Sequence, residues 1–187
     1  MTTGTIILCI VAAVLILLII YFIAAYNALI RQNNQVEEAF STMDVYLKKR
    51  WDLIPNLVET VKGYAAHERS TFEKIVSLRN QSYDTISPEE KLSLNNELTN
   101  AISKIIAVAE NYPDLKANQN FLNLNKELVQ VEKDIANARK YYNATVRDFN
   151  NKVQIFPSNL VASMAGFSKK TMFEAAMDER QNVEVHF

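Results

Sequence analysis

The sequence predicts an all-α protein with one N-terminal transmembrane helix, and three observations lead to that fold class. An apolar run without any charged residue extends from Ile6 to Tyr26. Apolar residues then recur at steps of three and four along most of the chain, which is the periodicity of amphipathic helices. Glycine and proline number only 3 and 4 among 187 residues. A many-stranded β fold needs a turn about every 8–12 residues, so this scarcity favours a few long helices.

The charge balance and the cysteine content exclude some classes of function. The 20 basic and 21 acidic residues nearly cancel, whereas a dedicated nucleic-acid surface usually shows a strong basic excess. We therefore expect no nucleic-acid partner. The only cysteine, Cys9, lies inside the apolar run, so no disulfide can form within one chain and cysteine does not report the compartment.

The apolar run, residues 6–26, is predicted to be a retained membrane span in contact with the lipid bilayer. Its 21 residues would rise roughly 31 Å as a helix, about the thickness of the hydrocarbon core. A cleaved signal peptide is the competing interpretation, but it requires a basic region that residues 1–5 lack. Arg31 and then Lys48 to Arg50 follow the span. The positive-inside rule therefore favours an outside N-terminus and a cytoplasmic domain.

The first bundle helix is predicted to continue from the span without a break to about Arg50. Its apolar stripe follows the seven-residue repeat typical of coiled coils. The members of this stripe are Tyr26, Leu29, Asn33, Val36, Phe40, Met43 and Leu47. The basic triplet Lys48-Lys49-Arg50 would then face the negative end of the helix dipole. The alternative is that the triplet meets phosphate groups.

A second helix is predicted from about Leu53 to Asn80, with Asp52 as its cap. Pro55 would fall in the first turn, where its missing N–H breaks no hydrogen bond. Gly63 would lie in the interior, where it would let a neighbouring helix approach closely.

The third and fourth helices have clear boundaries in the sequence. Ser87 followed by Pro88 and two acids is a helix start, and the third helix should end before Pro113. The fourth helix, from Phe121 to Val153, has the most regular stripe. Four such helices with short connections predict an elongated antiparallel four-helix bundle with shallow crossing angles.

Beyond Pro157 the pattern changes. The segment SNLVASMAGF is expected to form a short helix closed by Gly166. The tail then alternates, with Val183, Val185 and Phe187 on one side, as a β-strand does. Its partner strand would come from a second copy or another protein, by β-augmentation, and the alternative is a frayed terminus.

The chain therefore divides into four predicted parts. These are a short N-terminal segment at 1–5, the transmembrane helix at 6–26, the bundle at 27–156, and a short helix with an extended tail at 157–187.

No complete catalytic constellation is present. His67-Glu68 begins like the zinc motif H-E-x-x-H, but Thr71 occupies the second histidine position. There is no nucleophile elbow and no glycine-rich phosphate loop. We therefore predict no catalytic, cofactor-binding or metal-binding residue and no enzyme activity. The alternative is an enzyme whose site forms only between subunits, from Glu68, Glu110 and Asp114.

Several long segments resemble the LemA family. They are YNALIRQNNQVEEAF, MDVYLKKRWDLIPNLVETVKGYAAHE, AVAENYPDLKANQNFLNLNKELVQVEKDIANARKYYNATVRDFN, FPSNLVASMAGF and VEVHF. The resemblance covers nearly the whole chain, with a variable middle around residues 80–100. It implies a single-pass protein of the bacterial inner membrane with a helical bundle. The family has no agreed activity and no established catalytic residues, so none is carried over.

Together these observations predict a membrane-anchored helical scaffold or interaction protein. We expect it to self-assemble as a homo-oligomer and to contact other membrane proteins, without a cofactor. The alternative is an oligomer that shapes or encloses membrane.

Overall fold

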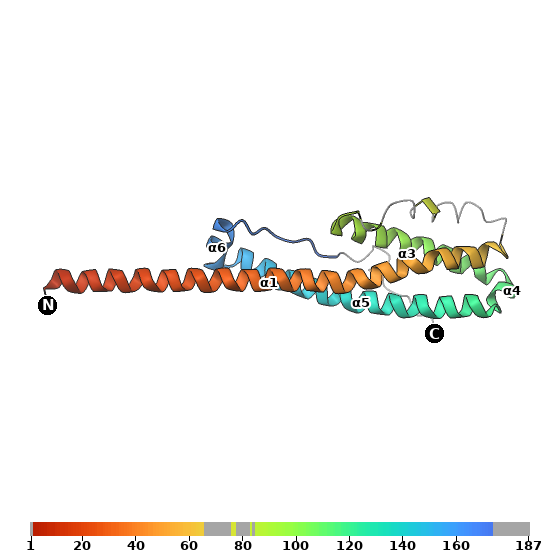
Figure 1. The fold of residues 1–187 in the computed structure, drawn as a ribbon, viewed down its shortest axis with the longest axis horizontal. Helices are drawn as coiled ribbons and strands as arrows, with labels where there is room; N and C mark the ends of the chain where they lie inside the picture. The colour runs from red at the N-terminus through yellow and green to blue at the C-terminus, as the bar shows by residue number, and fades with distance from the viewer. Residues whose placement is uncertain (1, 66–75, 78–82, 84, 174–187) are drawn as a thin grey trace, which may run out of the picture. The chain divides into compact units, whose positions relative to one another are not determined.

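The computed structural model describes residues 2–65, 76–77, 83 and 85–173, and every regular element in this part of the chain is a helix (Figure 1). The elements are α1 (Thr3–Lys62), α3 (Pro88–Glu110), α4 (Pro113–Lys116), α5 (Gln119–Gln154) and α6 (Ser158–Met164). The all-α fold class is confirmed. The chain forms two compact units. The first unit is Met1–Phe40 with Tyr141–Met172, and the second unit is Ser41–Lys140 with Phe173–Phe187.

Helix α1 joins the apolar run to the first bundle helix without a break, as predicted, but its predicted end near Arg50 is wrong. The helix continues through Pro55 to Lys62. A proline inside a helix costs about 3 kcal/mol. The apolar stripe continues past the proline and remains buried, and each such side chain contributes about 1.5–3 kcal/mol. The stripe comprises Trp51, Ile54, Leu57, Val58 and Val61. The free energy gained by burying this stripe therefore exceeds the cost of the proline inside the helix.

Asp52 and Gly63 also differ from their predicted roles. Asp52 caps no helix and instead pairs with Lys48 one turn earlier, at 2.9 Å between the charged atoms. Gly63 follows the last residue of α1. Among the described residues, the nearest atom to a Cβ placed there would be the Thr60 carbonyl oxygen at 3.7 Å. Within the part of the chain that the structure describes, this glycine therefore brings no neighbouring helix close. The remainder of the predicted second helix lies mostly outside the described residues.

The predicted start of α3 is confirmed in detail. Ser87 has extended backbone angles (φ −66°, ψ 161°), and its Oγ accepts from the Glu90 backbone N–H at 3.2 Å. The Glu90 carboxylate accepts from the Ser87 N–H at 2.7 Å, which completes a capping box. This hydrogen bond holds the pKa of the Glu90 carboxyl below its ordinary value. Helix α3 ends at Glu110, before Pro113, and the single turn α4 follows.

The core of the second unit lies between α1, α3 and α5. Its buried apolar residues include Met43, Leu47, Trp51, Ile54, Leu57, Leu94, Leu98, Ile102, Ile105, Leu115, Phe121, Leu128, Val131 and Ile135. Only two buried polar or charged residues, Arg50 and Asn95, interrupt this core in the described part of the chain. They lie at the centre of the candidate site.

In the first unit, the end of α5, helix α6 and the segment after it pack on α1. The buried residues include Leu29, Val36 and Ala39 of α1 with Tyr142, Val146, Phe149, Val161 and Ala162. Gly166 has a φ of 77°, so the predicted glycine end of α6 is confirmed. The Asn150 side chain donates to the Lys170 carbonyl and accepts from the Lys170 N–H, each at 2.9 Å. These bonds fasten the segment after α6 to α5.

Candidate functional site

The largest exposed apolar surface of the described chain is the first part of α1. The large apolar side chains between Ile6 and Tyr26 are 38–69% exposed. Monomeric soluble proteins rarely leave an apolar surface this extensive exposed to water. By length and composition, α1 is the one helix among the described residues that is able to cross a membrane.

A buried guanidinium occupies the middle of the second unit. Arg50 of α1 is fully buried, and its Nη1 atom donates to the Glu132 carboxylate of α5 at 2.5 Å. The same atom donates to the Thr99 Oγ1 of α3 at 3.0 Å, and Nη2 donates to the Asn95 carbonyl. One side chain therefore binds two neighbouring helices at once.

Burial controls the electrostatics of Arg50. Removal from water lowers the pKa of its guanidinium, and the charge of Glu132 acts in the opposite direction. The Arg50 side chain is 1% exposed, whereas that of Glu132 is 40% exposed. Arg50 Nε and Asn95 Oδ1 are buried, and neither has a hydrogen-bond partner among the described residues. Since guanidinium stays protonated in proteins, this position holds a permanent positive charge whose counterion reaches solvent.

A second polar cluster lies beside Arg50 in the same unit. The Asp44 carboxylate accepts from the Tyr83 hydroxyl at 2.7 Å and from Lys91 Nζ at 2.9 Å. Lys91 Nζ also lies 4.6 Å from the centre of the Tyr83 ring, within cation–π range. The Tyr83 ring centre is 5.5 Å from that of Trp51. This cluster connects α1 to the start of α3 through one carboxylate and one aromatic ring.

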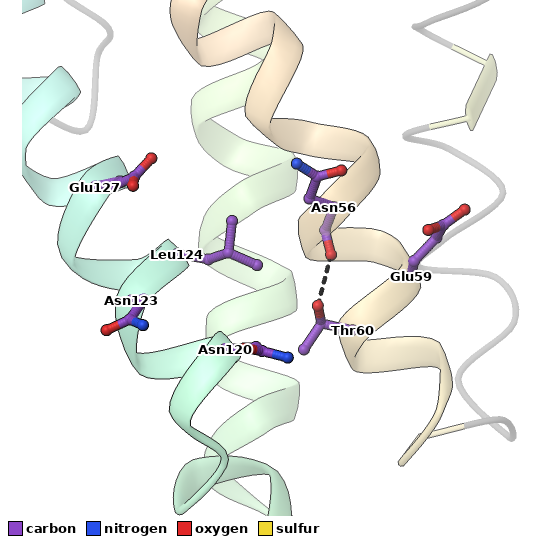
Figure 2. Close-up of a pocket in the computed structure, with 7 residues that line it drawn as sticks. All are labelled: Asn56, Glu59, Thr60, Asn120, Asn123, Leu124 and Glu127. Atoms are coloured by element: carbon purple, nitrogen blue, oxygen red, sulfur yellow. Dashed lines mark hydrogen bonds between the residues drawn. The ribbon is translucent and has the colours of Figure 1, made fainter.

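An open groove of about 370 Å³ lies between α1 and α5 in the second unit (Figure 2). Its lining is Asn56, Glu59 and Thr60 from α1 and Asn120, Asn123, Leu124 and Glu127 from α5. Figure 2 shows the two carboxylates on opposite sides and Leu124 between the helices. The Thr60 hydroxyl donates to the Asn56 carbonyl at 2.7 Å. Amide and carboxylate groups dominate, so the groove suits polar or cationic groups better than apolar ones.

The residues singled out in the sequence fall into three groups. Val183, Val185 and Phe187 lie outside the described residues, as do His67 and Glu68.

Glu110 and Asp114 are described, and both are exposed. In the described part of the chain, no three His, Cys, Asp or Glu side chains are grouped closely enough to hold a metal ion. The basic triplet does not end a helix, and its third member is the buried Arg50. The sequence interpretation therefore missed the Arg50 site.

One helix of this helical protein has a long exposed apolar segment. The chain therefore belongs to the class of helical proteins with a candidate membrane anchor. The model of the LemA family matches residues 39–187, and the chain belongs to this family. The match begins within α1, after the apolar segment.

Similar proteins carry two kinds of name. Protein LemA of Metamycoplasma hominis is 29% identical over 167 residues, covering 87% of this chain and 75% of that protein. Magnetosome protein MamQ 2 of Paramagnetospirillum magneticum is 23% identical over 189 residues, covering 85% and 70%. Magnetosome protein MamQ of Magnetospirillum gryphiswaldense is 22% identical over 174 residues, covering 79% and 64%.

Proposed function

We propose that the chain is a membrane-anchored helical interaction protein that self-assembles and that binds partners rather than catalysing a reaction. The observation that carries the proposal is the exposed apolar segment of α1, which continues as one helix into the bundle core. Fourteen exposed Ile, Leu, Val and Phe side chains lie between Ile6 and Tyr26. At about 0.3–0.6 kcal/mol each, they favour insertion by roughly 4–8 kcal/mol. No charged residue opposes this.

Alkaline extraction of membranes tests the anchor. The full chain should stay with the membrane pellet. A Leu15→Arg, Leu18→Arg double variant should move to the soluble fraction, because each charge at the centre of a span costs about 2.5–3.5 kcal/mol. Val45→Arg is the matched control, since Val45 is a 65% exposed apolar residue on α1 outside the span. Equal extraction of all three proteins would contradict the proposal.

The proposed orientation has the N-terminus outside the bacterial inner membrane and the bundle in the cytoplasm. It is supported by Arg31, the first charged residue after the span. A single-cysteine protein tests it, with Ser41→Cys in a Cys9→Ser background. Ser41 is exposed on α1. A membrane-impermeant maleimide should label it only after the cells are opened, and labelling of intact cells would reverse the orientation.

Self-association and foreign partners require a separate experiment. Cross-linking in intact membranes, followed by mass spectrometry, should give adducts between copies of this chain, with any attached membrane proteins. Recovery of uncross-linked monomer alone would remove self-assembly from the proposal.

A membrane-shaping oligomer is the second candidate function. It is supported by the relatives named as magnetosome proteins, since that name assigns proteins of similar sequence to a subcellular structure. Electron microscopy of the purified protein in vesicles distinguishes the two candidates. A simple interaction protein should leave vesicle shape unchanged, whereas a membrane-shaping oligomer should deform or coat the vesicles.

A further inference from the structure

The short helix α6 and the residue Phe156 just before it form an exposed apolar patch in the first unit. Phe156, Leu160 and Met164 are 74%, 57% and 77% exposed. Leu160 and Met164 are four residues apart and therefore share one face of the helix. The neighbouring Val161 is buried, so α6 packs by one side and presents the other.

In this unit α6 lies beside α1 (Figure 1). Ring contacts made by the segment after α6 fix its position along α1. Phe167 follows α6, and its ring centre lies 6.2 Å from that of Tyr26 and 6.1 Å from that of Phe149. Tyr26 is the last residue of the uncharged run. Met164 lies three positions before Phe167, a reach of at most about 11 Å. The patch therefore lies near the level at which α1 leaves the bilayer.

The charges around α6 complement a membrane surface. No charged residue occurs from Val153 to Ser168, and Lys152 and Lys169 flank this stretch. Basic residues at this depth are attracted to anionic lipid headgroups. An apolar face bounded by lysines is the pattern of a helix that lies in the membrane interface.

We propose that α6 lies in the membrane interface, with Phe156, Leu160 and Met164 among the lipid headgroups and upper acyl chains. The occupant of the patch is thus the lipid surface into which α1 inserts. This inference rests on the proposed anchoring by α1. It assigns the chain a second membrane contact, which begins at Phe156, far along the sequence from the first contact at residues 6–26. The bundle helices would then leave the membrane from two fixed points.

Depth-dependent fluorescence quenching tests the proposal in the full chain, reconstituted in phosphatidylcholine–phosphatidylglycerol vesicles. Met164→Cys in a Cys9→Ser background carries an environment-sensitive dye. Lipids with a spin label near the headgroup should quench this dye, and aqueous iodide should not. The same dye at Val45→Cys is the control, and iodide should quench it, because Val45 is exposed on α1 outside the span.

A dye at Leu15→Cys separates this inference from the anchoring itself. Lipids labelled deep in the acyl chain should quench it if α1 spans the bilayer. If the Leu15 dye is quenched and the Met164 dye responds only to iodide, α6 faces water and the inference is wrong. Protection of the Met164 dye from both quenchers would mean that protein covers the patch, which also overturns it.

Discussion

Replacing Glu132 by alanine should remove the counterion of a fully buried charge. Two unit charges about 4 Å apart attract by about 4 kcal/mol at an effective dielectric constant of 20. Because the Glu132 side chain is 40% exposed, we discount this value by about half for solvent screening. The free energy of unfolding should therefore fall by about 2 kcal/mol. The bonds from Arg50 to Thr99 and to the Asn95 carbonyl remain, which prevents a larger loss.

The single tryptophan makes this change measurable at the site. Trp51 follows Arg50, is 5% exposed and contacts the Tyr83 ring. Urea unfolding of the full chain in mild detergent is followed by tryptophan fluorescence and by far-ultraviolet circular dichroism. Glu127→Ala is the matched control, because Glu127 is an exposed acid on the same helix. Its effect should stay within about 0.5 kcal/mol.

A double-mutant cycle gives the result that would refute this reasoning. If Glu132 acts only as the counterion, then Arg50→Met with Glu132→Ala should be as stable as Arg50→Met alone. The coupling free energy between the two positions should thus equal the loss in the Glu132 single variant. Additive effects, or a Glu132→Ala protein as stable as the unchanged chain, would show that the ion pair does not hold Arg50 in the core.

Four further predictions concern the helix signals and the second polar cluster. Pro55→Ala should raise the free energy of unfolding by about 1–3 kcal/mol, because it restores a backbone donor inside α1. The urea midpoint should rise accordingly, and a lower midpoint would contradict this. Ser87→Ala should cost about 1 kcal/mol, and Ser87→Thr should cost less. The pKa of the Glu90 carboxyl in the folded chain lies below the ordinary 4.5. The Glu90 carboxylate therefore contributes to the free energy of unfolding above that pH, and this contribution is lost as the pH falls through the folded pKa. The stability difference between the unchanged chain and Glu90→Gln should accordingly shrink in acid. Tyr83→Phe should cost about 1–2 kcal/mol by removing the hydroxyl donor to Asp44, and an unchanged unfolding curve would exclude that bond.

Local chemistry explains which helix boundaries the sequence predicted correctly. The start of α3 depends on Ser87 and Glu90, whose side chains each accept a hydrogen bond from the other residue's backbone N–H across one turn. Such a signal is complete within four residues. The continuation of α1 through Pro55 depends instead on the burial of residues from Trp51 to Val61 against other helices. Asp52 and Pro55 suggested that one helix ends and another begins here, because tertiary burial is not visible in a local pattern.

The Arg50 site was hidden by its residue type, although its spacing could have revealed it. Met43, Leu47, Arg50, Ile54 and Leu57 follow three-four steps, and all five are buried. The basic neighbours made Arg50 resemble a solvated helix end. A charged residue on an apolar stripe has two interpretations. Either the buried stripe ends at that residue, or the charge is buried and paired with groups on other helices. The partners on α3 and α5 are 45 to 82 residues away, so only the fold could distinguish the two cases.

The buried network gives the apolar stripes of the second unit one preferred register. Stripes with a seven-residue repeat can slide by one repeat and still bury apolar side chains against each other. Such a slide would separate Arg50 from Glu132, Thr99 and the Asn95 carbonyl together, and it would leave a buried charge unpaired, which costs about 3–5 kcal/mol. An apolar residue at position 50 would remove this penalty. Arg50→Met should therefore keep the helical circular dichroism while losing register. Disulfide formation between cysteines introduced at Leu47 and at α3 positions one repeat apart should then change from one preferred pair to two.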